Sequence, residues 1–511
     1  MTIYLLQITV FFFLPLHWCL GQTSPISYNV DFQSNITGMP GNLLNDVWGY
    51  VRNGEEFAIV GSRSAINFFN VTECDNPVSI AVIEDGNTVI WRDFKTYGDY
   101  AYGVCDGSAC NRGLEIFRLS DYSWFRTTAF FSRAHNIFIE NGRLYAAGTN
   151  TFNNGLVILD IATNPESPSL IANIILPGGY VHDVFVRNDT AYASHGYYGY
   201  AVYDFTDLSD TSDPASFIIG SIQETIGYNH SSWIHPYDHY AFIAEEVPLG
   251  MPMYVYDLAD PANPQIVHTF KNPLELNATN NVPHNPFVKD DILYISYYHD
   301  GLQIYDVTDP LDPIRIGFYD TYPQNNGLGY SGYHGAWGVY PFLPSGCILV
   351  SDIENGFFTF RLSRHPLMSY LQEGDLYLKE PGSGIVIYDH NNDPIKIGIN
   401  DLGELIKFNI SPSFPVGADL NNSQVYIKHG GGLILTSPGG LLYKISMLGK
   451  NLSSTLISSL PEKYIELSSG NFLLKRKGSG IIFQNAGGVC LKLRWDKAGL
   501  PQQWIYGCPV E

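Results

Sequence analysis

A unit of four short strands recurs along the first two thirds of the chain. The stretch "HNIFIENGRLYAAGTNTFNNGLVILDIATNPESPSLIANII", which begins at residue 135, shows apolar runs of strand length separated by turn residues. Seven such units follow one another, with starts 43 to 54 residues apart. Self-similarity at this period is typical of a β-propeller, in which small sheets pack around an axis. We therefore predict an all-β chain that contains a seven-bladed β-propeller.

The last unit ends soon after "FFTFRLS" and lacks a fourth strand. Residues 26–34, "ISYNVDFQS", have strand character and precede the first unit. We expect them to supply the missing strand and close the ring. The predicted domains are a signal peptide at 1–21, a propeller at 22–364 and a smaller three-repeat β domain at 365–511.

Most units open on a histidine. The innermost strand of a blade lines the central channel, so we expect the residues at its start to converge near the axis. The opening positions of the seven units are Val47, Arg92, His135, His182, His230, His284 and His334. Polar residues follow several of them, namely Asp93, Asn136, Asp183 and Asn285.

Three roles are open for these histidines. Neutral imidazoles ligate Zn²⁺ and similar ions, so His135, His182, His230, His284 and His334 form a candidate site for a divalent metal ion, with Arg92, Asp93 and Asp183 nearby. Alternatively, the ring and Arg92 hold an anion, more tightly as the histidines protonate near pH 6. In the third interpretation, each histidine is structural and donates a hydrogen bond to the neighbouring blade.

Catalysis has less support in the sequence. The chain contains no G-x-S-x-G, no H-E-x-x-H and no P-loop. Acidic pairs such as Glu245-Glu246 are expected on solvent-facing loops. An extracellular metal-dependent hydrolase with its site at the propeller axis is retained as an alternative function.

The N-terminus and the charge indicate a secreted protein. Residues 4–15, "YLLQITVFFFLP", have the length of a signal-peptide core, and no later segment is long and apolar enough to span a membrane. The formal net charge is −22, which disfavours a nucleic-acid partner.

Sequons and cysteines fit the same compartment. Eight Asn-x-Ser/Thr sequons predict a glycoprotein, at Asn35, Asn70, Asn188, Asn229, Asn277, Asn409, Asn421 and Asn451. Removing the signal peptide leaves six cysteines, an even number suited to disulfides. Six cysteines allow fifteen pairings, of which we favour Cys74–Cys347, Cys105–Cys110 and Cys490–Cys508.

The tail carries a second repeat. Lys379, Lys428 and Lys475 mark equivalent points of three strand-turn-strand units, 49 and 47 residues apart. Three such units predict a β-trefoil-like domain or a small β-prism. "QQW" at residues 502–504 resembles the Gln-x-Trp of ricin-type lectins, which repeat it, whereas it occurs once here. Glycan binding and a module for assembly are the two functions considered for the tail.

The long repeat resembles the LVIVD repeats of the choice-of-anchor B family. The resemblance covers about residues 40–363 and rests on "GLVILDIATNPESP", "GLQIYDVTDPLDP", the His-Asn/Asp starts and "HGAWGVYPFLPSGCILVSDIENGFF". It implies a propeller outside the cytoplasm. The tail and the missing histidines of the first two units depart from the family pattern. Together these features predict a secreted, glycosylated binding or structural protein whose partner is an extracellular protein, matrix or glycan.

Overall fold

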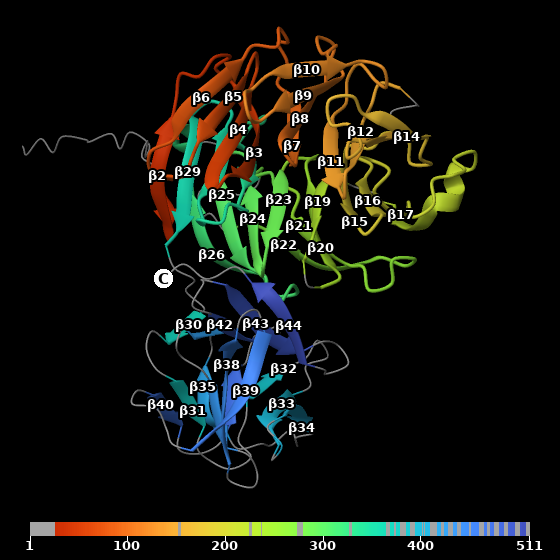
Figure 1. The fold of residues 1–511 in the computed structure, drawn as a ribbon. Coiled ribbons are helices and arrows are strands. Elements are labelled where there is room, and N and C mark those ends of the chain that lie inside the picture. The colour runs from red at the N-terminus through yellow and green to blue at the C-terminus, as the bar shows by residue number, and fades with distance from the viewer. Residues whose placement is uncertain are drawn as a thin grey trace, which may run out of the picture.

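The computed structural model describes residues 26–363 apart from 152–154, 224–226, 237, 273–279 and 326–329, and residues 368–506 chiefly in their strands (Figure 1). The described residues are almost entirely β-structure, with short 3₁₀ turns at η2 (Pro214–Phe217) and η3 (Pro323–Asn325). The prediction of an all-β protein is therefore confirmed. Among the described residues, no helix has the length and apolar character that crossing a membrane requires.

Between residues 27 and 362, the strands that the structure describes form seven antiparallel sheets, each built mainly from strands that are consecutive in the chain. The first sheet contains β3 (Leu44–Arg52), β4 (Glu55–Ser62), β5 (Ile66–Asn70) and β6 (Val78–Ile83), and the second contains β7 (Arg92–Tyr97), β8 (Tyr100–Cys105), β9 (Leu114–Arg118) and β10 (Trp124–Thr127). The third sheet contains β11 (Asn136–Glu140), β12 (Arg143–Ala147), β13 (Leu156–Asp160) and β14 (Ser169–Ile174). The fourth contains β15 (Asp183–Arg187), β16 (Thr190–Ser194), β17 (Tyr200–Asp204) and β18 (Ile218–Ile222). The fifth sheet contains β19 (Asn229–Ile234), β20 (Tyr240–Glu245), β21 (Met253–Asp257) and β22 (Gln265–Phe270). The sixth contains β23 (Asn285–Lys289), β24 (Ile292–Ser296), β25 (Leu302–Asp306) and β26 (Ile314–Tyr319), together with β1 (Ser27–Tyr28). The seventh contains β27 (Ala336–Tyr340), β28 (Ile348–Asp352) and β29 (Gly356–Leu362), together with β2 (Val30–Ile36).

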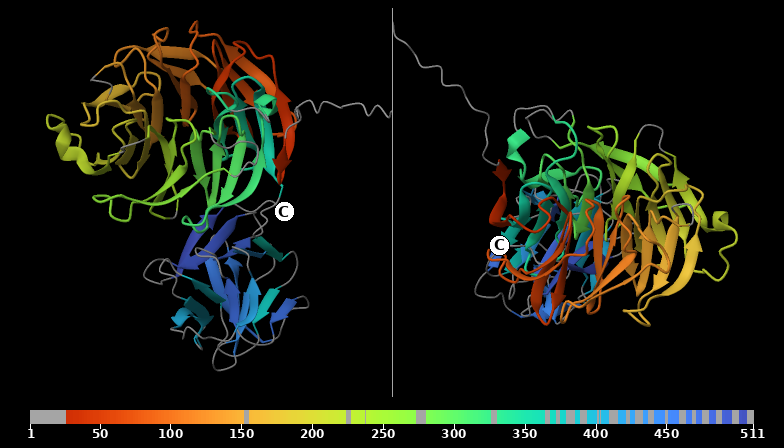
Figure 2. Two further views of the ribbon diagram at one scale, coloured as in Figure 1. Left: turned by 180° about the vertical axis from the view of Figure 1, so that it is seen from behind. Right: turned by 90° about the horizontal axis from the view of Figure 1, so that it is seen from above.

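The seven sheets close into a ring. The first strand of each sheet contacts the first strand of the next, and β27 contacts β3 again (Figure 2). Each neighbouring pair of sheets shares a buried apolar cluster; Tyr145 and Val184, for example, meet between the third and fourth sheets. Because one sheet cannot bury both of its faces, the shared clusters hold the ring together. This layout confirms the predicted β-propeller fold.

The N-terminal strand completes the last sheet, as the sequence led us to expect. β2 pairs antiparallel with β29, so that Val30 faces Leu362 and Ile36 faces Phe357. Cys74 and Cys347 join the first and last sheets at a Cα–Cα distance of 5.7 Å, and Cys105 and Cys110 are bonded at 5.8 Å. Both predicted pairs thus lie at disulfide distance.

Local chemistry explains the regular turns and twist of the sheets. In the "DPxxP" turns, the carboxylates of Asp260 and Asp309 accept hydrogen bonds from the amides of Ala262 and Leu311, two residues further on. These bonds satisfy backbone groups that the reversing chain would otherwise leave without a partner. A register shift recurs where the third and fourth strands pair in five sheets, and such bulges increase the twist of a sheet.

The C-terminal residues form three further sheets of five strands each, which we call the C-terminal sheets. Their strands are β30 (Met368–Leu371), β31 (Asp375–Leu378), β32 (Ile385–Tyr388), β33 (Pro394–Ile399), β34 (Leu405–Phe408), β35 (Val416–Leu420), β36 (Gln424–Ile427), β37 (Leu433–Thr436), β38 (Leu442–Leu448), β39 (Asn451–Ile457), β40 (Tyr464–Leu467), β41 (Asn471–Leu474), β42 (Gly480–Gln484), β43 (Cys490–Trp495) and β44 (Pro501–Tyr506). β31, β36 and β41 end one residue before Lys379, Lys428 and Lys475, which themselves lie outside the described residues.

The C-terminal sheets contact the ring through a buried ion pair. Lys492 in β43 binds Asp291, which lies in the turn between β23 and β24, and both side chains are fully buried. His235, directly after β19, lies with its Nε2 3.2 Å from Oδ1 of Asp291. The two regions therefore meet at the fifth and sixth sheets of the ring.

Candidate functional site at the channel mouth

Four of the predicted histidines lie side by side at one end of the ring. The ring centroids of His135 and His182 are 4.1 Å apart, those of His182 and His230 are 4.2 Å apart, and those of His230 and His284 are 4.4 Å apart. We call these four residues the histidine cluster. They adjoin because each stands at the start of the innermost strand of its sheet, as the repeat predicts.

The backbone places three of these histidines in the same way. His135, His182 and His284 directly precede β11, β15 and β23, and the amide of each donates to the end of the second strand, with N···O distances of 2.8–3.0 Å. His230 is the second residue of β19. Repetition of the sheet thus repeats the position of the imidazole.

In three of the four histidine rings, Nδ1 forms a hydrogen bond to a neighbouring sheet. Nδ1 of His182 donates to the carbonyl of His230 at 2.8 Å, and Nδ1 of His230 donates to that of His284 at 3.2 Å. Nδ1 of His284 donates to the carbonyl of Trp337 at 2.5 Å. A carbonyl only accepts, so Nδ1 carries the proton and the lone pair of a neutral ring is on Nε2. This is the structural role predicted for the histidines, and it leaves the second nitrogen of each ring available.

Burial keeps these imidazoles neutral. It lowers the pKa of His182 and of His230 well below the usual value, helped by the other histidines nearby. Burial also lowers the pKa of His284 to about 3. These lowered pKa values disfavour the protonated rings that the predicted anion site would require.

The structure corrects the predicted positions of two residues. His334 does not join the cluster, because its Nδ1 binds the carboxylate of Glu354 and its ring packs 5.5 Å from that of Tyr322. Arg92 borders the channel, but its guanidinium is fully buried and binds Asp85 at 2.7 and 2.9 Å. Arg92 is thus occupied by an internal ion pair and does not offer its charge to a ligand.

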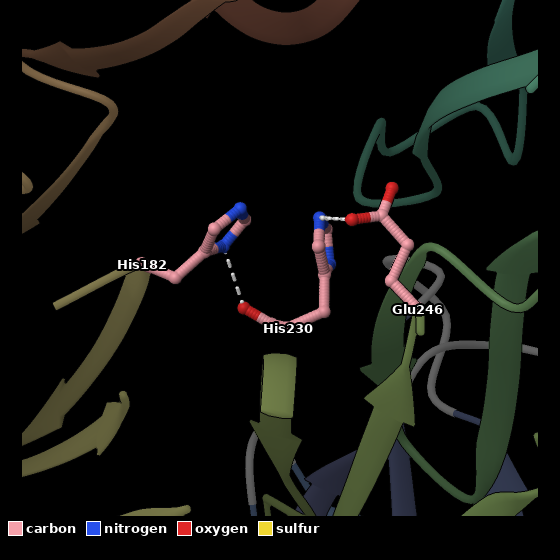
Figure 3. Close-up of side chains that lie close together, drawn as sticks. All are labelled: His182, His230 and Glu246. Atoms are coloured by element: carbon pink, nitrogen blue, oxygen red, sulfur yellow. Dashed lines mark hydrogen bonds and ion pairs between the residues drawn. The ribbon is translucent and has the colours of Figure 1, made fainter. Parts of the chain in front are cut away.

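Glu246 is the site residue that the sequence interpretation missed. Together with His182 and His230, it brings three ligand-type atoms within 4.8 Å of one another (Figure 3). Its side chain is 17% exposed, and Oε1 accepts a hydrogen bond from the hydroxyl of Tyr298 at 2.9 Å. Glu245 is fully buried, so the expectation that this acidic pair faces solvent is wrong. The signal that could have found Glu246 is its place just after the second strand of a histidine-bearing unit.

Carboxylates and one lysine line the channel next to the cluster. Nζ of Lys95 lies 2.6 Å from Asp93, and the amide of Asn136 donates to Asp183 at 3.1 Å. Burial by itself lowers the pKa of Lys95, but Asp93, Asp46 and Asp183 outweigh it and raise that pKa. Burial, and then the charge of Asp93, raises the pKa of Asp183 to about 7.

The channel opens into a larger cleft. A narrow cavity of about 30 Å³ is lined by residues that include the four histidines, Trp91 and Trp337. The same two tryptophans also line a wider cleft of about 700 Å³, together with Tyr298, Tyr333 and Glu246. The cavity of the histidine cluster therefore adjoins an aromatic-walled cleft, with which it shares Trp91 and Trp337.

The remaining predicted residues are spread over the surface and the tail. Asn188 is exposed, as is Asn35, and Asn70 is partly exposed. Asn229 is fully buried and donates to Glu245 at 3.0 Å, so this sequon is incompatible with a glycan in the folded protein. Cys490 is disulfide-bonded. Three sequons and one cysteine lie outside the described residues, at Asn277, Asn409, Asn421 and Cys508, and the side chains of Asn451 and Trp504 also lie outside them.

Comparison with known proteins adds no functional family. No family model matches the chain, and neither does any curated protein sequence. Among solved structures, the chain is similar to the β-propeller domain of Cps50 (Swd1) from Myceliophteria thermophila, with 11% identity and a TM-score of 0.45 over 65% of this chain and 98% of that one. It is also similar to the computationally designed Ika8 protein, with 6% identity and a TM-score of 0.42 over 65% of this chain and 99% of that one. The resemblance to LVIVD repeats remains a prediction.

Proposed function

We propose that this chain is a secreted, glycosylated, seven-bladed propeller that acts as an extracellular binding scaffold. The closed ring and its two disulfides support a rigid platform suited to an oxidising compartment. The observation that carries the proposal is the cleft of about 700 Å³ at the channel mouth. Ligand sites are typically concave and aromatic, with a few polar groups that fix orientation.

The lining of the cleft indicates the chemistry of the partner. Trp91 and Tyr333 are 45% and 40% exposed, so their rings offer apolar area to a ligand. Glu246 and Glu354 add carboxylates to the same wall, and the whole chain has a formal net charge of −22. Aromatic rings next to carboxylates attract cationic side chains. The partner proposed is a segment of an extracellular protein that carries lysine or arginine.

A displayed peptide library tests this function. The full chain is used for selection, and the selected peptides are measured against Trp91→Ala, Tyr333→Ala and the control Tyr28→Ala, which alters an exposed aromatic residue on the outer strand β1. We expect the peptides to be rich in Lys and Arg, to bind both cleft variants at least about tenfold more weakly, and to bind the control normally. Selection of no peptide, or of peptides that bind Trp91→Ala and Tyr333→Ala as well as the wild type, would contradict the proposal.

A further inference from the structure

We infer that His182, His230 and Glu246 form a site for a first-row divalent transition metal ion such as Zn²⁺, beside the cleft that Glu246 lines. The ligand atoms are Nε2 of each imidazole and Oε2 of the carboxylate. These three residues come from the starts of two innermost strands and from the end of β20 (Figure 3). The inference adds to the proposed binding role without depending on it.

The first argument is the orientation of the imidazoles. His182 and His230 each donate Nδ1–H to a backbone carbonyl of the next sheet, at 2.8 and 3.2 Å. Histidines that ligate metals almost always donate their other ring nitrogen to a carbonyl or a carboxylate, which fixes the tautomer and the direction of the lone pair. The hydrogen bonds that join the sheets therefore also prepare both rings to coordinate through Nε2.

The second argument concerns the contact between His230 and Glu246. Nε2 of His230 and Oε2 of Glu246 lie 3.9 Å apart, too far for a hydrogen bond. In the neutral tautomer both atoms present lone pairs, so neither satisfies the other. A cation between them would bind both. Oε1 of Glu246 is already held by the hydroxyl of Tyr298, so all three side chains are oriented by a neighbouring group.

The third argument is the fit of the atoms to a metal ion. Two ligands at about 2.1 Å in a tetrahedral site are about 3.4 Å apart. The present spacing, up to 4.8 Å, closes to that value when the side chains move by roughly 1 Å. Two histidines and one glutamate suit Zn²⁺ or a neighbouring transition metal better than Ca²⁺ or Mg²⁺, which prefer oxygen ligands. The fourth position would face the cleft and hold water or a ligand atom.

The test uses the metal alone and separates coordination from structure. In His182→Asn and His230→Asn, the side-chain NH₂ of asparagine lies near the position of Nδ1 and can still donate a hydrogen bond to the carbonyl. The ligand atom Nε2 is removed. Glu246→Gln keeps an oxygen for the hydroxyl of Tyr298 and removes the charge. The control is His195→Asn, because His195 is equally buried but both of its nitrogens already have partners, in the carbonyl of Tyr180 and the hydroxyl of Tyr203.

Purified full-length protein is stripped with chelator and titrated with Zn²⁺ and with Co²⁺, using calorimetry, elemental analysis and the Co²⁺ absorption spectrum. We expect one ion per wild-type chain, a higher melting temperature with Zn²⁺, and affinity reduced roughly 10- to 100-fold or more in the three site variants. The control should bind like the wild type. The inference is overturned if the wild type binds neither ion, if the three site variants keep wild-type affinity, or if His195→Asn loses binding as they do. Peptide binding is not measured here, so the metal site and the proposed function can fail separately.

Discussion

The ring and the C-terminal sheets are both built from repeats, but they assemble their sheets in different ways. In the ring, consecutive strands form one sheet, and only the edge strands β1 and β2 come from elsewhere in the chain. In the C-terminal sheets, every sheet takes strands from all three repeats, when these are taken as β30 to β34, β35 to β39 and β40 to β44. β30, β36 and β42, for example, pair in parallel at steps of 56 residues.

This difference shows what a sequence repeat does and does not determine. A repeat indicates that a unit is copied, but not that each copy closes its own sheet. Antiparallel hairpins, such as β11 with β12, form between neighbours in the chain and can fold locally. Parallel pairs need distant segments, so the C-terminal sheets require all three repeats at once.

Removing one repeat from the tail should have the largest effect, and it tests whether the C-terminal sheets need all three repeats. Ending the chain after residue 458 deletes β40 to β44, which contribute to every one of the C-terminal sheets. We expect the whole C-terminal region to unfold while the ring keeps its own transition, because all three sheets lose strands at once. Calorimetry and limited proteolysis measure this. A protected fragment covering residues 368–458 would show instead that two repeats fold without the third.

Opening the ring is the next largest test. The Cys74–Cys347 bond spans 273 residues, whereas Cys105–Cys110 spans 5. By the loop-entropy account, the double change Cys74→Ser/Cys347→Ser should lower the free energy of unfolding by about 5.6 kcal/mol, and Cys105→Ser/Cys110→Ser by about 2 kcal/mol. Denaturant unfolding measures both values. Equal losses in the two variants would mean that the long bond does not act by closing the ring.

The sequence predicted the ring better than the site, and the reasons are physical. Alternating apolar runs and turn residues are local signals, so the four-strand units and the inward position of His135, His182, His230 and His284 could be found. Glu246 was missed, because its place directly after β20 is only a weak signal, and its position beside His230 depends on how the chain turns at the channel mouth.

The failures at other positions have similar causes. His334 opens the last unit, but the carboxylate of Glu354 holds it outside the cluster. Arg92 is drawn to Asp85, seven residues earlier, which no repeat pattern indicates. The exchange of strands among the C-terminal repeats involves pairing between distant segments, which local periodicity in the sequence does not predict. The trefoil-like description of that region therefore remains a prediction.

The histidine cluster lies in the ring and not in the C-terminal sheets, so its effect on stability at different pH values belongs to the ring. The folded pKa of His284, about 3, lies below that of an unfolded histidine, near 6.5. The unfolded chain therefore binds the extra proton first, and stability is lost as pH falls below about 6.5. Between pH 7.5 and 4.5, the wild type should lose roughly 3 kcal/mol more than His284→Asn. Urea unfolding at both pH values measures this, and equal losses would rule out a buried neutral ring.

The smallest expected effect distinguishes two sequons within the ring. Asn188 is exposed at the turn between β15 and β16, whereas Asn229 is fully buried in β19 with its amide bound to Glu245. A glycan needs the amide nitrogen in solvent, so we expect Asn188 to be occupied and Asn229 to be bare in protein secreted by eukaryotic cells. Glycopeptide mass spectrometry measures both occupancies. Asn188→Gln should remove the mass of one glycan and leave stability within about 0.5 kcal/mol of the wild type, because it alters an exposed side chain. A glycan found on Asn229 in the folded, secreted protein would contradict the burial of this side chain in β19.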